Sequence, residues 1–371
     1  MDDLGAMLRQ ARENAGWSLG KFAKAANLDK GYLSRVERGR QEVSATVVLA
    51  YQRVLGDDNV NRRELLNRLG ATMIAPAAAS ELIYHGFESA LSGRKRSEDE
   101  WLELVDSYGR DYMSLGAGEV QTRLAGDLVV LQQQIEQPRL WAVAARLMTV
   151  NGKTLPTNDQ RQGAIHWYRL ASVAADRSED VATRVWVRGR SALALAYEGA
   201  ALPVASQLAD QALALSDAPT LGRLNALVAK AHVAAILGDR RTSEEALNEA
   251  RRVFDRAGSD DSASDFNVPE WRFWTFVSML LSRTGDPRAV EAQDAADRTR
   301  PQDLQRFATH IELHRGLYMA KSGDVNAGIA YAHRALSALP TEKRSLSLRL
   351  MIAEVEATAG TSSISAPHGA R

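Results

Sequence analysis

Basic and hydroxyl side chains gather between residues 18 and 40. An arginine guanidinium can form two parallel hydrogen bonds with guanine, so Arg35 is the first candidate for reading a base, and Lys30 is the second. Gly31 would let the backbone approach a duplex closely. The candidates for contacts with base edges or nearby backbone are Lys30, Gly31, Tyr32, Ser34 and Arg35. The candidates for contacts with phosphate groups are Ser18, Lys21, Arg38 and Arg40.

Four short helices are predicted to position these side chains. Gly16 and Gly39 suit helix ends, because glycine readily takes the left-handed conformation there. Ser18 and Asp29 suit helix starts, because their side chains can accept a hydrogen bond from a free backbone N–H. Asn27 suits the turn between the second and third helices. The predicted helices span residues 4–15, 19–26, 30–38 and 44–55.

Apolar spacing predicts that the second and third helices cross near a right angle. Ala23 lies at the crossing, and Leu33 and Val36 follow it by ten and thirteen residues as buried anchors. Such a pair joined by a short turn is a helix-turn-helix. The segment GWSLGKFAKAANLDKGYLSRVERGR resembles the phage-repressor-like, xenobiotic-response-element family of DNA-binding domains. The resemblance covers residues 4 to about 56 and implies that the second helix of the pair enters the major groove of DNA.

One residue departs from the family pattern. Many members have Gln directly after the Ser that caps the first helix of the pair, and that Gln contacts the DNA backbone. Here the position holds Leu19, so this phosphate contact is absent and must come from another side chain.

Composition excludes several classes of protein. The 371 residues include 46 Lys and Arg, 46 Asp and Glu, and no Cys. The chain therefore has no disulfide, no thiolate metal site and no Cys nucleophile. Residues 1–70 hold 12 basic and 9 acidic side chains, which gives the N-terminal region a small positive excess. The acidic N-terminus and the lack of an apolar run of about 20 residues predict a cytoplasmic protein without a membrane span.

A repeat begins past residue 136. Helix ends are marked by Gly199, Gly238, Gly285 and Gly323, at spacings of 39, 47 and 38 residues. After most of these glycines, small residues follow seven apart, so they share one face of a second helix and let a neighbour approach. The copy from Ile311 to Pro340 is the clearest. The pattern resembles the tetratricopeptide repeat, with five copies over residues 138–340.

We therefore predict an all-α fold in which a repressor-like helix-turn-helix domain precedes a tetratricopeptide-like α-solenoid. The predicted parts are a DNA-binding domain (1–70), a linker with connecting helices (71–137), the repeats (138–340), a capping helix (341–359) and a disordered tail (360–371). A generic α-bundle with alanine-rich interfaces is the alternative for the repeat region.

The first helix of each tetratricopeptide repeat lines the concave side of the array, where such proteins bind extended peptides. Positions counted relative to Gly316 and its equivalents in the other repeats predict which side chains of these first helices face inward. Such side chains could bind a peptide or its terminal carboxylate. These positions are Arg139, Arg146, Trp186, Asn225, His232, Arg272, Arg283, His310 and Lys321.

The combination of domains resembles Gram-positive quorum-sensing regulators that bind an oligopeptide, and actinobacterial regulators of development and antibiotic production. It implies a sequence-specific transcriptional regulator with a double-stranded operator and a peptide or protein ligand. A homodimer is expected, because one helix-turn-helix reads few base pairs. The alternatives are a protein-interaction scaffold, and an antitoxin or phage-immunity component that uses DNA binding for autoregulation.

Other motifs carry weaker signals. Asn151-Gly152-Lys153-Thr154 contains the GKT end of a phosphate-binding loop, but Leu147 stands where the loop requires glycine. His310 and His314 lie four apart on a predicted helix, with no Glu to complete a metalloprotease motif. We expect no enzyme activity, no cofactor and no metal site.

Overall fold

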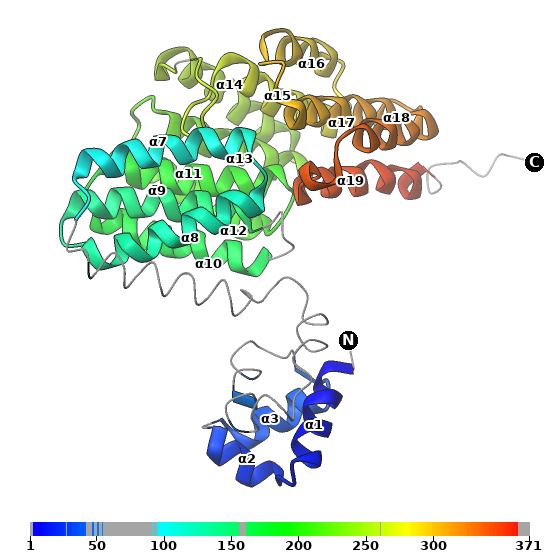
Figure 1. Cartoon of the computed structure of the whole chain (residues 1–371). Helices are drawn as coiled ribbons and strands as arrows, with labels where there is room; N and C mark the ends of the chain where they lie inside the picture. Colours follow the sequence, from blue (N-terminus) through cyan, green and yellow to red (C-terminus); the bar gives the residue numbers. More distant parts are fainter. Residues whose placement is uncertain are drawn as a thin grey trace, which may run out of the picture. The chain divides into compact units, whose positions relative to one another are not determined.

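The computed structural model describes residues 3–26, 28–41, 47, 50, 51, 54, 91, 95–155, 161–259 and 261–362. The chain divides into two compact units, Met1–Glu81 and Leu82–Arg371 (Figure 1). The described residues are mainly helical and include no strand, which confirms the predicted all-α class. The predicted domain boundary at residue 70 lies outside the described residues.

Three helices of the first unit confirm the predicted ones to within a residue or so. They are α1 (Asp3–Asn14), α2 (Leu19–Ala26) and α3 (Lys30–Glu37). Val47, Ala50, Tyr51 and Val54 are also helical, and the rest of the predicted helix 44–55 lies outside the described residues. The core includes the predicted anchors and is formed by Leu8, Phe22, Ala23, Ala26, Leu33, Val36, Val47, Ala50 and Tyr51.

The second unit is a stack of helices. From residue 95 onward, the first seven described helices are α7 (Glu98–Ser114), α8 (Ala117–Gln134), α9 (Pro138–Thr154), α10 (Arg161–Arg177), α11 (Val181–Tyr197), α12 (Leu202–Leu215) and α13 (Leu221–Ile236). The others are α14 (Arg240–Ala257), α15 (Glu270–Thr284), α16 (Arg288–Thr299), α17 (Gln305–Lys321), α18 (Val325–Ala338) and α19 (Leu346–Ser362). A short 3-10 turn, η4 (Thr341–Lys343), precedes α19.

The helices of this unit alternate between two layers. The odd-numbered helices from α7 to α19 each pack beside the next odd-numbered one, and α10, α12, α14, α16 and α18 each pack on the helix before them (Figure 1). The five hairpins from α9 to α18 match the positions of the five predicted repeats. The second unit is therefore a helical-repeat region.

Glycines shape the turns and the closest helix contacts. Gly199, Gly238, Gly285 and Gly323 have φ angles of 67°, 80°, 66° and 110°, which confirms that they reverse the chain in the left-handed conformation. Gly189 of α11 faces the backbone of α13 at Gly222, so closely that a Cβ on Gly189 would overlap the Gly222 carbonyl oxygen. These contacts let two helix backbones touch.

The ends of the repeat region differ from the prediction. Helices α7 and α8, expected as connectors, both pack against α9. Ser97 begins α7 with a capping box in which its Oγ accepts from the Glu100 N–H and the Glu100 carboxylate accepts from the Ser97 N–H. The terminal helix begins at Leu346 and not at Thr341, because η4 intervenes, and it continues to Ser362. The predicted tail beyond that residue, 363–371, lies outside the described residues.

Candidate functional site

The turn between α2 and α3 sets the start of α3. The Ser18 Oγ accepts from the Lys21 N–H at 3.4 Å, and the Asp29 Oδ1 accepts from the Tyr32 N–H at 2.7 Å. The Leu28 N–H donates to the Ala23 carbonyl at 2.9 Å and closes the end of α2. Both predicted caps thus satisfy backbone donors that would otherwise be free, and α3 begins in a defined direction.

A buried ion pair clamps α1 to α3. The Arg12 guanidinium donates through Nε and Nη2 to the two carboxylate oxygens of Glu37, at 2.6 and 2.7 Å, and its Nη1 donates to the Trp17 carbonyl at 2.7 Å. The Tyr51 hydroxyl donates to the same carboxylate. Arg12 and Glu37 are both 5% exposed, so a charge left without its partner there would be costly. The residue spacing did not reveal this clamp.

All nine predicted DNA-contacting residues lie at the surface of this unit. Tyr32 and Ser34 are half-buried. The other seven are exposed: Ser18, Lys21, Lys30, Gly31, Arg35, Arg38 and Arg40. Because α2 and α3 carry eight of the nine or flank them directly, the candidates share one local framework whose apolar faces are buried in the core.

Among the described residues, the Arg35 side chain makes one hydrogen bond. Its Nε donates to the Gln41 Oε1 at 3.2 Å, an exposed contact that a stronger partner could replace. A Cβ at Gly31 would lie 3.5 Å from the Arg35 Nη1 and 3.2 Å from the Asp29 Oδ1. Glycine at this position therefore leaves space beside the guanidinium.

Residues 3–65 match a protein-family model described as a helix-turn-helix domain. The first unit contains a helix-turn-helix DNA-binding domain. No curated protein and no solved structure matches the chain. The helix-turn-helix domain supports DNA binding, and its matched span covers the α2–α3 pair together with the clamp of Arg12 and Glu37.

The structure places most predicted ligand positions of the helical-repeat region inside the helix layers. Arg139 and Lys321 are exposed, Arg146 is half-buried, and Arg139 pairs with Glu98 at 3.1 Å. The other six are buried: Trp186, Asn225, His232, Arg272, Arg283 and His310. They are not on an open surface, because the neighbouring first helices of the hairpins pack directly against one another.

Arg283 joins four helices. Its guanidinium donates to the carbonyls of Ala196 and Tyr197 at 3.3 and 2.8 Å, to the His232 Nδ1 at 2.9 Å and to the Glu354 carboxylate at 2.9–3.2 Å. Burial, and then the charge of Arg283, lower the pKa of His232 well below its usual range. Both side chains therefore have a structural role within the layers.

His310 and His314 converge on Tyr197. The Tyr197 hydroxyl lies 3.3 Å from the His310 Nδ1 and 3.1 Å from the His314 Nε2, and the Ser278 Oγ lies 2.6 Å from the His314 Nδ1. Burial lowers the pKa of His310 to about 3 and lowers that of His314 as well, so both rings are neutral at ordinary pH.

Arg272 and His310 line a cavity whose basic residues the sequence did not single out as a group. Its lining also includes Lys153, Arg190 and Arg306, from α9, α11 and α17. The space within it is about 70 Å³. Lys153 belongs to the GKT motif, which here is part of the buried face of α9 and not a loop. The composition of helices gave no signal that these cations would meet, because they lie on different repeats.

None of the described helices is long and apolar enough to cross a membrane.

Proposed function

We propose that this chain is a sequence-specific transcriptional regulator of the phage-repressor-like, xenobiotic-response-element type. The observation that carries the proposal is the surface of α3, where Lys30 is exposed at the capped N-terminus and Arg35 is exposed in the last turn. Recognition helices of this class contact base edges through such residues. The basic side chains before and after α3 would bind phosphates and set the register. The regulator would be cytoplasmic and would carry out no catalysis.

Binding as a homodimer follows from the small footprint of one helix-turn-helix. Two copies would read half-sites about one helical turn, roughly 34 Å, or a multiple of it apart. We place the dimer contacts mainly beyond residue 75, since the first unit is too small to offer a large interface as well as a DNA-binding surface. Sedimentation of the full chain should show a dimer at micromolar concentration, and a chain ending at residue 70 should be monomeric and bind DNA weakly.

The helical-repeat region would act as a sensor. Five hairpins with the positions of the predicted repeats support a tetratricopeptide-like array, and such arrays bind peptides or protein segments. A ligand that prefers one of two conformations would change DNA affinity, with a coupling of about 1–3 kcal/mol between the two sites. Operator affinity with and without cell extract or candidate peptides tests this part of the proposal.

DNA binding is tested by selecting fragments from a random duplex pool with the full-length protein. The affinity for the selected operator should exceed the affinity for scrambled DNA by a factor of about 10³ or more, and it should fall steeply as salt rises. Equal affinity for both DNAs, or none, would overturn the proposal and favour a protein-interaction scaffold.

A further inference from the structure

One buried carboxylate in the helical-repeat region serves three buried cations. The Asp265 Oδ1 accepts from the Arg190 Nη2 at 2.8 Å, from the Arg272 Nη2 at 2.7 Å and from the Lys153 ammonium. Asp265 is 2% exposed and belongs to the segment between α14 and α15, whose backbone is held by a bond from the Asp265 N–H to the Gly109 carbonyl at 2.9 Å. Burial alone would raise the pKa of Asp265, but the three cations lower it, so the group is ionised.

The charge around the neighbouring cavity does not balance. Lys153, Arg190, Arg272 and Arg306 line it together with one carboxylate, Glu198, and Asp265 lies behind the first three. Burial, and then the charge of Arg190, lower the pKa of Lys153. Even if Lys153 is neutral, three guanidinium groups face two carboxylates among the described residues. The site therefore has a positive excess in a region of low dielectric, where an unbalanced charge is expensive.

Two donors at the cavity have no hydrogen-bond partner in the described part of the chain. These are the Nε atoms of Arg190 and Arg272, both fully buried. Buried donors are nearly always paired with protein, water or a ligand. Both side chains line the cavity, but the two Nε atoms themselves are sealed from it, so an anion placed there would be held by the positive charge of the guanidinium groups and not by these two N–H groups.

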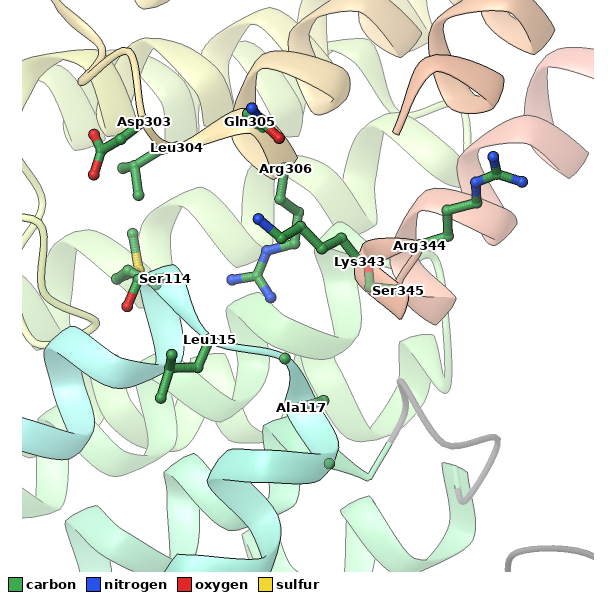
Figure 2. A pocket seen from close by; sticks show the side chains of 13 residues that line it. Ser114, Leu115, Ala117, Asp303, Leu304, Gln305, Arg306, Lys343, Arg344 and Ser345 are labelled. Atoms are coloured by element: carbon green, nitrogen blue, oxygen red, sulfur yellow. The ribbon is translucent and has the colours of Figure 1, made fainter. Parts of the chain in front are cut away.

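A second cavity adjoins the first, and its lining residues are more exposed, so it is called the outer cavity. It has about 100 Å³ of space and shares Arg306 and Ser345 with the inner one. Figure 2 shows the side chains of Arg306 and Lys343 directed into this space, while Arg344 points away. The Arg344 guanidinium is held by the carbonyls of Leu339 and Ser337, at 2.7 and 3.0 Å. Arg306 thus stands between the two cavities, and Lys343 adds another cation at the outer one.

We propose that the inner cavity binds the oxyanion group of a small ligand, a carboxylate or a phosphate, with the rest of the ligand in the outer cavity. Arg190 and Arg272 attract the anion from the buried side through their charge, since the Arg272 Nη1 and Nη2 already donate to Ser264, Asn267 and Asp265, and Arg306 holds it from the side of the outer cavity. That this ligand is the effector of the sensor rests on the proposed regulatory function, whereas binding of the anion does not.

The test is isothermal titration calorimetry of the full-length protein, without DNA, at constant ionic strength set with chloride. Acetate, inorganic phosphate and citrate are the probes. Comparing the affinities for acetate and phosphate shows whether the cavity prefers a carboxylate or a phosphate. At least one probe should bind saturably. Arg306→Gln should weaken that binding about tenfold or more, and Arg315→Gln, a matched change on the same helix outside the cavity, should leave it unchanged.

The Asp265→Asn variant provides a second test in the same titration. Removing this carboxylate should strengthen binding of the same anion, because one negative charge beside it is lost. If Asp265→Asn does not fold, the comparison of Arg306→Gln with Arg315→Gln still tests whether the cavity binds the anion. If both arginine variants bind the probe equally well, or if no probe gives a binding heat, the proposed anion site is wrong.

Operator affinity measured with and without the bound probe separates the two proposals. A change that Arg306→Gln abolishes supports the anion as effector. Saturable binding without any change in operator affinity leaves the anion site supported and counts against the proposed sensor function.

Discussion

The Arg12 guanidinium forms two hydrogen bonds with the Glu37 carboxylate across 25 residues of sequence, at 2.6 and 2.7 Å, and thereby holds α1 against the end of α3. Both side chains are buried, and the Tyr51 hydroxyl donates a third hydrogen bond to the carboxylate. The surface that carries Arg35 therefore depends on a polar contact inside the helix-turn-helix domain.

Replacing Glu37 should destabilise that domain. Glu37→Ala leaves the Arg12 charge buried without a carboxylate, a change that typically costs about 3–5 kcal/mol. Hydrogen exchange of peptides from residues 3–41 should become faster, while peptides from α13 should not change. Arg9→Ala, which breaks the exposed pair of Arg9 and Glu13, is the control and should leave exchange unaltered. Slow exchange in Glu37→Ala would mean that the clamp contributes little.

Arg35 and Arg40 should differ in their effect on DNA binding. Arg35→Ala should weaken binding to the selected operator by about 1–3 kcal/mol and relax the preference at one base pair of each half-site. Arg40→Ala should weaken all sequences about equally and lower the salt slope by about one. Fluorescence anisotropy with single-base operator variants at several salt concentrations measures both effects. Arg169→Ala, an exposed position on α10, provides the charge control. If Arg35→Ala left the base preference unchanged, the assignment of α3 as the recognition helix would be wrong.

The contact between α11 and α13 should not tolerate a side chain. A Cβ at Gly189 would overlap the Gly222 carbonyl oxygen and lie 3.2 Å from the Ala226 backbone nitrogen, and neither backbone atom can move without its helix. Gly189→Ala should therefore destabilise the helical-repeat region by about 1–3 kcal/mol, despite the higher helix propensity of alanine. Thermal unfolding followed by circular dichroism measures the loss.

Gly118→Ala is the matched control for this substitution. Gly118 lies near the start of α8, and nothing is within 4 Å of a Cβ placed there. It should be neutral or slightly stabilising, since alanine favours a helix. Equal melting temperatures for Gly189→Ala and Gly118→Ala would show that the two helices can separate freely.

Lowering the pH should destabilise the helical-repeat region even at pH values that are higher than those at which carboxylates titrate. Burial, and then the charge of Arg306, hold the pKa of His310 at about 3, whereas an unfolded histidine titrates near about 6.5. Below pH 6.5 the unfolded state binds the proton first, so stability present above that pH falls as the pH decreases toward 3. For His310 the loss is about 2 kcal/mol at pH 5 relative to neutral pH.

Urea unfolding at pH 7.5 and at pH 5 measures this loss. His310→Gln should reduce the difference between the two pH values, and His166→Gln, at an exposed position on α10, should not. The buried rings of His232 and His314 should add to the loss in the same direction. A stability that is the same at both pH values would exclude buried neutral histidines.

Local signals in the sequence predicted the elements of this protein. The caps at Ser18 and Asp29 and the glycines at helix ends act through atoms within a few residues, so the helices and the helix-turn-helix spacing could be recognised without tertiary information. The small residues that recur seven apart likewise predicted stacked hairpins, because they share one face of a helix.

Only the tertiary structure brings the residues of the basic cavity together. Asp265 meets Lys153 and Arg190 across 112 and 75 residues of sequence, and these pairings depend on how the repeats stack and on where the segment between α14 and α15 folds back. The phase rule for a regular repeat pointed Asn225 and His232 toward a groove, whereas side-chain packing between neighbouring helices buried both. Periodicity predicts which face of a helix is covered, but the residues that contact one another across repeats follow from the packing of the whole array.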